Sequence, residues 1–97
     1  MKLRFTPRAT ADLIAIADYI RSRKPVASLE VRDAILASLQ TLVLFPEIGR
    51  RQTVEGVRKL VTRKYGYLVY YVVDQANEEI AILTIQHPAR RREFSDL

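Results

Sequence analysis

The chain of 97 residues has the length of one domain, and its 48% of hydrophobic residues indicate a folded protein with one core rather than a disordered chain. It has no cysteine and a single histidine, which excludes disulfides, thiolate metal sites and histidine-rich metal sites, so we expect no metal or cofactor and a reducing, cytoplasmic location. Arginine supplies most of the 16 basic residues and the net charge is +5, which favours a polyanionic partner, whereas no apolar run approaches the roughly 18 residues of a membrane span.

The N-terminal half predicts one short strand followed by two helices. Residues 2–5 alternate polar and apolar side chains, as a strand does. Thr6 supplies a hydroxyl for a helix N-cap and Pro7 suits the first helical position, so we expect a helix that ends just before Pro25. Pro25 then opens a second helix, which Pro46 stops. Two amphipathic helices with so short a connection predict an antiparallel helical hairpin.

Each predicted helix carries one apolar stripe that indicates its buried face. In the first helix the stripe consists of Ala9, Leu13, Ile16, Ala17 and Ile20. In the second helix it consists of Val31, Ile35, Leu39 and Leu42, widened by Leu36 and Val43. Asp12 and Asp18 fall off the first stripe, and we expect both to be solvated surface charges.

The C-terminal half is rich in β-branched and aromatic residues and predicts three strands, at residues 57–64, 67–74 and 79–87, with a hairpin turn at 75–78. The strand at 67–74 is apolar on both faces, which is typical of a central strand covered on both sides. The element order predicts an α+β fold in a single domain of residues 1–97, in which the helical hairpin packs on one face of a small, mainly antiparallel sheet.

A stretch near the C-terminus holds charged groups of the kind that act on RNA. The only histidine, His87, is followed by Arg90, Arg91 and Arg92. Metal-free RNA cleavage needs a base, an acid and cations on the phosphate. The candidate set is Arg58, Arg63, His87 and Arg90. The other interpretation is a structural histidine beside a partner-binding face, and it is favoured because the spacing matches no catalytic motif.

Four tyrosines gather around the strand at 67–74, and two roles are open to them: stacking on unpaired bases and packing in the core. They are Tyr65, Tyr67, Tyr70 and Tyr71. We expect Tyr70 and Tyr71 to be core residues, since tyrosine favours strands. For Tyr65 and Tyr67, which lie near the start of the strand, both roles stay open.

Four segments form a connected series along almost the whole chain. They are "FTPRATADLIAIADYI", "LFPEIGRR", "VRKLVTRKYGYLVYYVVD" and "IAILTIQHPARR". This series resembles the RelE/ParE superfamily of toxins from bacterial toxin–antitoxin modules. The resemblance implies a helical hairpin on an antiparallel sheet, which is the fold that the residues predict on their own. It also implies an antitoxin, a hetero-oligomer of toxin and antitoxin, and a role in plasmid stabilisation.

The superfamily divides by activity, and the site residues of its nuclease branch can be matched to positions of this chain. RelE-like members cleave mRNA in the ribosome with basic residues on the sheet and an arginine and a tyrosine near the C-terminus. ParE-like members lack that set and poison DNA gyrase. The leading basic position is kept as Arg58. The other matched positions carry Leu60, Tyr67, Pro88 and Phe94. Leucine and proline cannot hold a phosphate and phenylalanine has no hydroxyl, so the nuclease site is largely missing, with Arg90 or His87 as partial substitutes.

The resemblance therefore implies a ParE-like toxin that inhibits DNA gyrase without being an enzyme, and the alternative is a RelE-like ribosome-dependent mRNA endoribonuclease. The partner it implies is a ParD-like antitoxin, a ribbon-helix-helix DNA-binding protein, and no membrane is involved. The residues expected to bind antitoxin or target are Arg58, Arg63, Tyr65, Tyr67, His87, Arg90, Arg91 and Arg92.

Overall fold

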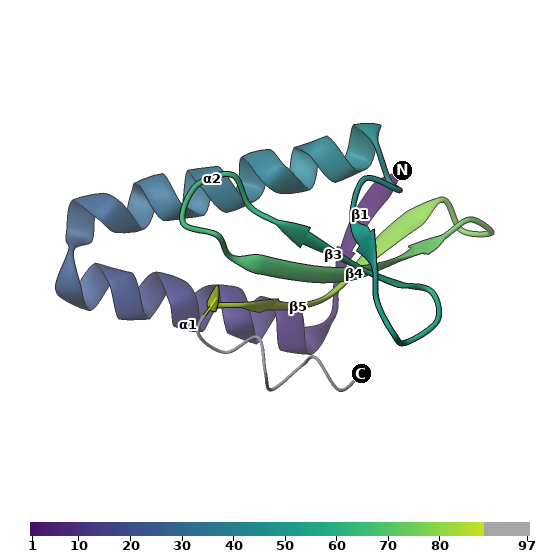
Figure 1. Cartoon of the computed structure of the whole chain (residues 1–97). Coiled ribbons are helices and arrows are strands. Elements are labelled where there is room, and N and C mark those ends of the chain that lie inside the picture. Colours follow the sequence, from purple (N-terminus) through teal and green to yellow (C-terminus); the bar gives the residue numbers. More distant parts are fainter. Residues whose placement is uncertain (89–97) are drawn as a thin grey trace.

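The computed structural model describes residues 1–88, and Figure 1 shows two long helices lying against a sheet. The elements follow in the order β1 (Lys2–Phe5), α1 (Pro7–Arg23), α2 (Pro25–Leu44), β2 (Arg50–Arg51), β3 (Val57–Val61), β4 (Leu68–Asp74) and β5 (Glu79–Gln86). This is the α+β architecture that the sequence predicts. In the part of the chain that is described, neither helix is long and apolar enough to cross a membrane.

The five strands form one mixed sheet in the order β1-β5-β4-β3-β2. β1 pairs with β5 in parallel, with Lys2 opposite Glu79, and the other pairings are antiparallel. β4 therefore lies in the middle, as its two apolar faces predict. β2 is not among the predicted strands, and the prediction of a strand at residues 57–64 is wrong at its end, because β3 ends at Val61. The reason is a turn in which Tyr65 and Gly66 adopt positive φ angles of 66° and 64°.

Local sequence determines where the two helices begin and where the chain turns between them. The Thr6 hydroxyl caps α1 by accepting a hydrogen bond from the Ala9 amide at 3.0 Å, and Pro7 occupies the first turn, where its missing N–H is not needed. Lys24 alone separates α1 from α2, because Pro25 disfavours the helical conformation in the residue before it. The two helices therefore run antiparallel, as Figure 1 shows.

The predicted stripes of both helices face the sheet and form the main core with it. The buried helical residues are Ala9, Val31, Ile35, Leu39 and Leu42. The sheet contributes Tyr67, Val69, Tyr71, Ile80, Ile82 and Ile85. Leu13, Ile16 and Ile20 are partly buried and pack against this core. Leu36 does not widen the stripe of α2 as predicted, because it is 40% exposed.

The opposite face of the sheet carries a second, smaller apolar cluster. Val57, Leu68 and Tyr70 are buried there, with Val54, Val72 and Leu83 packed against them. Along β4, Val69 and Tyr71 thus belong to the main core, while Leu68 and Tyr70 belong to the second cluster. This alternation is the one that a strand requires, and it confirms that Tyr70 and Tyr71 are core residues.

Candidate functional site

The motif "LFPEIGRR" forms a loop that two side chains of the sheet hold in place. From β4, the Tyr71 hydroxyl donates to the carbonyl of Pro46 and accepts from the amide of Gly49, both at 2.8 Å. From β3, the Arg58 guanidinium donates to the carbonyl of Glu47 at 3.0 Å and to that of Gly49 at 2.8 Å. The loop between α2 and β2 is therefore fixed to the sheet through its backbone.

The close approach of Tyr71 explains why glycine occupies position 49. A Cβ atom on Gly49 would lie 2.5 Å from the Tyr71 hydroxyl oxygen, which is closer than any side chain tolerates. Tyr71 is fully buried, and this burial raises its pKa, although the Gly49 amide and the nearby Arg58 partly offset the effect. The hydroxyl consequently stays protonated at neutral pH and keeps its proton for the Pro46 carbonyl.

A second group of predicted residues lies where β3 turns back into β4 and where β5 ends. The hydroxyl of Tyr65, in the turn, donates to the Glu30 carboxylate of α2 at 3.1 Å, and this hydrogen bond is the main cause that raises the pKa of Tyr65. Tyr65 is 46% exposed, so a partner can reach its ring. We call Tyr65, Tyr67 and His87 the turn cluster.

Tyr67 and His87 contact each other edge to face. Their ring centroids are 5.6 Å apart and their planes differ by 86°, a favourable arrangement for two aromatic rings. Tyr67 is 5% exposed and belongs to the main core, and burial raises its pKa. His87 is exposed. The structure thus favours packing over base stacking for Tyr67, whose ring supports the exposed His87.

The predicted site residues are divided between the two places. Arg58 stands opposite Tyr71, whereas His87 follows the end of β5 that is level with Leu68. Along β4, Tyr71 and Leu68 are three residue steps apart, which is about 10 Å at roughly 3.3 Å per residue. Arg63 is exposed in the turn beside the turn cluster. Arg90, Arg91 and Arg92 lie outside the described residues.

Asp12 of α1 is not the solvated surface charge that its position off the apolar stripe predicts. Its carboxylate accepts hydrogen bonds from the Thr84 hydroxyl and from the Ile85 amide, the latter at 3.2 Å. Both donors lie beside an irregularity in the pairing of β4 with β5. Asp12 therefore pins α1 to β5. Asp18 is exposed, as predicted, and it pairs with Arg21 on the same helix.

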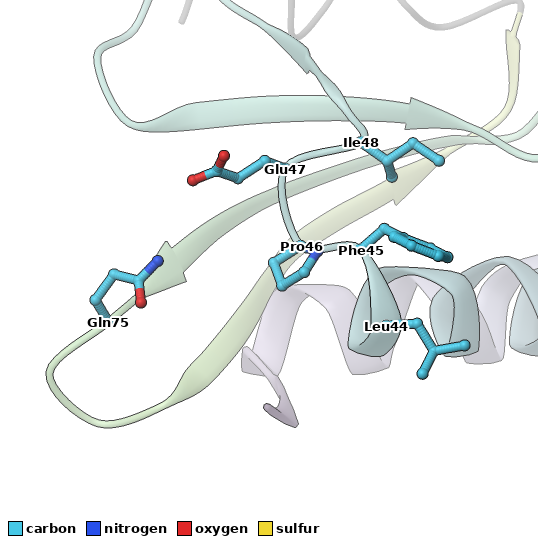
Figure 2. A pocket seen from close by; sticks show the side chains of 6 residues that line it. All are labelled: Leu44, Phe45, Pro46, Glu47, Ile48 and Gln75. Carbon is cyan, nitrogen blue, oxygen red and sulfur yellow. The ribbon is translucent and has the colours of Figure 1, made fainter.

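The end of α2 and the loop between α2 and β2 also carry an apolar surface. Leu44, Phe45 and Ile48 are 73%, 60% and 53% exposed. A shallow pocket of about 520 Å³ is lined by Leu44, Phe45, Pro46, Glu47, Ile48 and Gln75. In Figure 2, Phe45 and Ile48 extend to one side of the loop, and Glu47 extends to the other side. Exposed side chains of this size, gathered on one loop, are typical of a surface that meets a partner.

The two strands after this loop place like charges directly opposite each other. β2 pairs with β3 so that Arg50 stands opposite Lys59 and Arg51 stands opposite Arg58. Directly opposed like charges destabilise a sheet. Arg50, Arg51 and Lys59 form no ion pair with any side chain of residues 1–88. An anionic partner would relieve this repulsion.

These arrangements offer chemistry for binding. Within residues 1–88, no three His, Cys, Asp or Glu side chains gather in a group that could hold a metal ion. The guanidinium of Arg58 is engaged by two backbone carbonyls, and His87 lies at another level of the sheet. Exposed arginines and apolar side chains can together hold a partner that carries both carboxylates and apolar groups.

Comparisons with known proteins agree with this description over nearly the whole chain. Residues 3–92 match a family model described as the ParE toxin of the type II toxin–antitoxin system parDE. Toxin RelE2 of Caulobacter vibrioides is 36% identical over 86 residues, which cover 89% of this chain and 93% of that protein. Toxin RelE3 of the same organism is 30% identical over 88 residues, which cover 89% and 92% of the two chains.

Solved structures share the fold. A chain of the chromosomal ParDE system from P. aeruginosa matches with a TM-score of 0.77 and 31% identity, covering 90% of this chain and 95% of that one. The isolated E. coli RelE toxin matches with a TM-score of 0.71 and 18% identity, covering 98% and 92% of the two chains. At the lower identity, the likeness shows the fold alone.

Proposed function

Because the chain belongs to the RelE/ParE superfamily of toxins from type II toxin–antitoxin systems, we propose that it is a ParE-like toxin that binds and inhibits DNA gyrase. One observation carries this choice within the superfamily. By the resemblance described above, two positions at which RelE-type nucleases carry basic residues hold Leu60 and Tyr67 in this chain. Both side chains pack in or against the main core, so neither can hold a phosphate.

Arg58, the cation kept at a nuclease-matched position, also has a structural task. Its Nη1 atom donates to the carbonyls of Glu47 and Gly49 and so holds the loop between α2 and β2. A guanidinium carries five N–H donors, and these two bonds leave those of Nη2 and Nε for another acceptor. The choice of function therefore rests on Leu60 and Tyr67 rather than on Arg58.

We further propose that a ParD-like ribbon-helix-helix antitoxin neutralises this toxin in the cytoplasm, within a toxin–antitoxin hetero-oligomer. A toxin–antitoxin complex is the form in which the E. coli RelBE neighbour is described. The helical hairpin exposes Ile14, Tyr19, Leu29 and Leu36. A helical or extended antitoxin segment would cover these apolar anchors and place carboxylates on Arg63 and on Arg90–Arg92.

The second candidate function is a RelE-like ribosome-dependent mRNA endoribonuclease. It is favoured by one observation, since both Caulobacter relatives bear the name RelE. In that case His87, exposed and supported by Tyr67, would serve as the acid or base. Arg63 and Arg90 would hold the phosphate.

Induction of the toxin in a bacterial host separates the two functions. A gyrase inhibitor is expected to cause filamentation and a DNA damage response while mRNA stays intact. Co-expression of the antitoxin serves as the control, because it should restore growth. Rapid arrest of translation together with cut mRNA would overturn the proposal in favour of the endoribonuclease.

A further inference from the structure

The turn that joins β2 to β3 borders a second pocket, separate from the apolar pocket at the end of α2. Its volume is about 450 Å³, which lies in the range of small-molecule sites. It is lined by Arg51, Gln52, Glu55, Gly56, Val57 and Arg58. A Cβ atom on Gly56 would meet no atom within 4 Å, so the space beside this residue is open to a ligand.

Two arginines reach this pocket from neighbouring strands. Arg51 of β2 and Arg58 of β3 stand directly opposite each other, so their side chains leave the same face of the sheet, with Cβ atoms about 5 Å apart. Arg50 precedes Arg51 on β2 and therefore points to the other face. The pairing of the strands thus places two guanidinium groups side by side at one pocket.

Both guanidinium groups have donors left for a ligand. Arg58 uses Nη1 for the carbonyls of Glu47 and Gly49, which leaves the N–H groups of Nε and Nη2. Arg51 is exposed and forms no ion pair with any side chain of residues 1–88. The positive charge of the pocket is therefore available to an anion.

We propose that this pocket binds a small sugar phosphate, such as a nucleoside monophosphate. The phosphate bridges Arg51 and Arg58, and the carboxylate of Glu55 accepts a hydrogen bond from a sugar hydroxyl. This proposal goes beyond the function proposed above, because the pocket is present whichever molecule the toxin inhibits.

The two opposed guanidinium groups select a phosphate that has a single ester bond. At neutral pH such a phosphate carries about −1.5 to −2 charges and three acceptor oxygens, so it can bind both arginine forks at once. Each phosphodiester of a nucleic acid backbone carries one negative charge and has two free oxygens. A carboxylate also carries one charge. Two arginines at this spacing therefore favour the monoester over both.

Glu55 indicates that the ligand carries hydroxyl groups as well. A carboxylate beside two arginines repels a bare anion, yet it accepts hydrogen bonds from hydroxyls. Acidic side chains bind ribose hydroxyls in this way in dinucleotide-binding folds. Gln52 adds an acceptor, because its Nε2 donates to the carbonyls of Arg50 and Arg51, at 2.8 and 3.1 Å, and its Oε1 takes no part in these bonds.

The pocket is held in one conformation by hydrogen bonds within the turn. The amide of Gln52 donates to the carbonyl of Val57 at 2.9 Å, and the amide of Val57 donates to the carbonyl of Val54 at 3.1 Å. Arg58 is fixed by its two bonds to the loop between α2 and β2. A ligand consequently loses little affinity to ordering the site.

The test titrates the purified, 15N-labelled full chain with adenosine monophosphate, ribose phosphate, inorganic phosphate and cyclic adenosine monophosphate. The cyclic compound has the same base and sugar, but its phosphate is a diester. Amide chemical shifts locate the site and give each affinity. We expect the first two compounds to shift the amides of residues 51–58 and to bind at least about fivefold more tightly than the other two.

Neighbouring arginines on β2 provide a matched pair of variants. Arg51→Gln is expected to weaken the binding of adenosine monophosphate about tenfold, because a charge-assisted hydrogen bond is lost. Arg50→Gln removes the same charge from the other face of the sheet, and its effect should stay within about twofold. Both arginines are exposed, so neither variant removes a buried contact.

Glu55→Ala tests the recognition of the sugar. It should tighten the binding of inorganic phosphate by removing a repulsive charge, and it should weaken the binding of ribose phosphate by removing an acceptor. The ratio of the two affinities therefore falls. Glu47→Ala removes an equally charged, exposed side chain that does not line this pocket, and it should leave the ratio unchanged.

Four results would overturn the proposal. They are equal losses in Arg50→Gln and Arg51→Gln, equal affinity for adenosine monophosphate and its cyclic form, and an unchanged ratio in Glu55→Ala. The fourth is a DNA strand with a terminal phosphate that binds through Arg51 more tightly than adenosine monophosphate does, since the occupant would then be the end of a nucleic acid.

Discussion

At the scale of single residues, one buried hydroxyl organises a surface loop. Tyr71 lies in the main core, yet its hydroxyl reaches the loop and both donates and accepts there. The amide of the buried Gly49 has this hydroxyl as its partner. Buried polar groups in native proteins are almost always hydrogen-bonded, so losing this partner has a definite energetic effect.

Tyr71→Phe is expected to lower the free energy of unfolding by roughly 1–3 kcal/mol, because it leaves a buried amide without its acceptor. Urea denaturation followed by circular dichroism measures the change. Tyr19→Phe is the matched control, since Tyr19 is 57% exposed, and its effect should stay within about 0.5 kcal/mol. Equal effects of the two variants would contradict the stabilising role of the hydrogen bonds between Tyr71 and the loop.

Tyr71→Phe is also expected to change how the stability of the fold depends on pH. Burial raises the pKa of Tyr71 in the folded protein above its ordinary value. The contribution of this group is therefore fully present below the ordinary tyrosine pKa of about 10 and is lost as pH rises through the raised value. Between about pH 10 and 12, the wild type should lose more stability than Tyr71→Phe, and denaturation series at both pH values measure the difference.

His87→Gln is expected to change toxicity little, because the exposed ring of His87 rests on Tyr67 and glutamine keeps a polar end. Replacing Arg90, Arg91 and Arg92 together should instead lower toxicity through weaker target binding. Growth after induction measures both effects, and antitoxin pull-down verifies folding. A general acid or base contributes roughly 10²–10⁴-fold in rate. A folded His87→Gln protein without toxicity, beside a toxic triple variant, would restore the nuclease.

At the scale of elements, the sequence predicts what short-range patterns encode and misses what depends on long-range contacts. The helices follow from caps, prolines and 3.6-residue periodicity, and the central place of β4 follows from its two apolar faces. β2 does not follow from the sequence, because its two arginines, Arg50 and Arg51, show no apolar alternation. The end of β3 does not follow either, because no local rule requires Tyr65 to adopt a positive φ.

The candidate site was harder to predict than the fold for the same reason. In the sequence, Pro46 and Gly49 indicate only the end of a helix. Gly49 is also needed because the hydroxyl of Tyr71, 22 residues later, lies too close for a Cβ atom. The sequence predicts a surface charge for Asp12 because its hydrogen-bond partners lie more than 70 residues away, on β5. A short acidic side chain next to an apolar stripe is the signal that can point to such a contact.

Asp12→Ala tests the attachment of α1 to the sheet. The carboxylate binds the Thr84 hydroxyl and the Ile85 amide, so its loss should lower the free energy of unfolding by roughly 1–3 kcal/mol. Asp18→Ala removes the same group from the exposed side of α1, and its effect should be below about 1 kcal/mol. Thermal denaturation of both variants measures the loss of stability. An equal loss in Asp18→Ala and Asp12→Ala would contradict the attachment of α1 to the sheet through Asp12.

At the scale of the whole molecule, the candidate binding residues lie near the two ends of α2, and the chain carries an excess of positive charge. The net charge is +5, and the exposed arginines include Arg63 in the turn before β4 and Arg50 on β2. A protein of this kind is expected to attract an acidic antitoxin over long range and to hold it with apolar contacts.

The affinity of the cognate antitoxin is accordingly expected to fall as salt rises. Arg63→Glu should slow association and weaken this salt dependence, whereas Lys2→Glu, an equal charge change on β1, should have a smaller effect. Surface plasmon resonance between about 50 and 300 mM salt measures the association and dissociation rates. Salt screens exposed charges over this range. Affinity that is indifferent to salt and to Arg63 would refute the electrostatic part of antitoxin binding.

We propose that this toxin binds gyrase and does not cut mRNA, since Leu60 and Tyr67, which the resemblance matches to basic residues of RelE-type nucleases, are packed in or against the main core. The most direct measurement adds the purified chain to DNA gyrase, ATP and relaxed plasmid, with translating ribosomes and mRNA as a parallel reaction. Gyrase inhibition predicts that supercoiling stops as toxin is added, that antitoxin restores it, and that the mRNA stays whole. Unchanged supercoiling together with cleaved mRNA on the ribosome would contradict it.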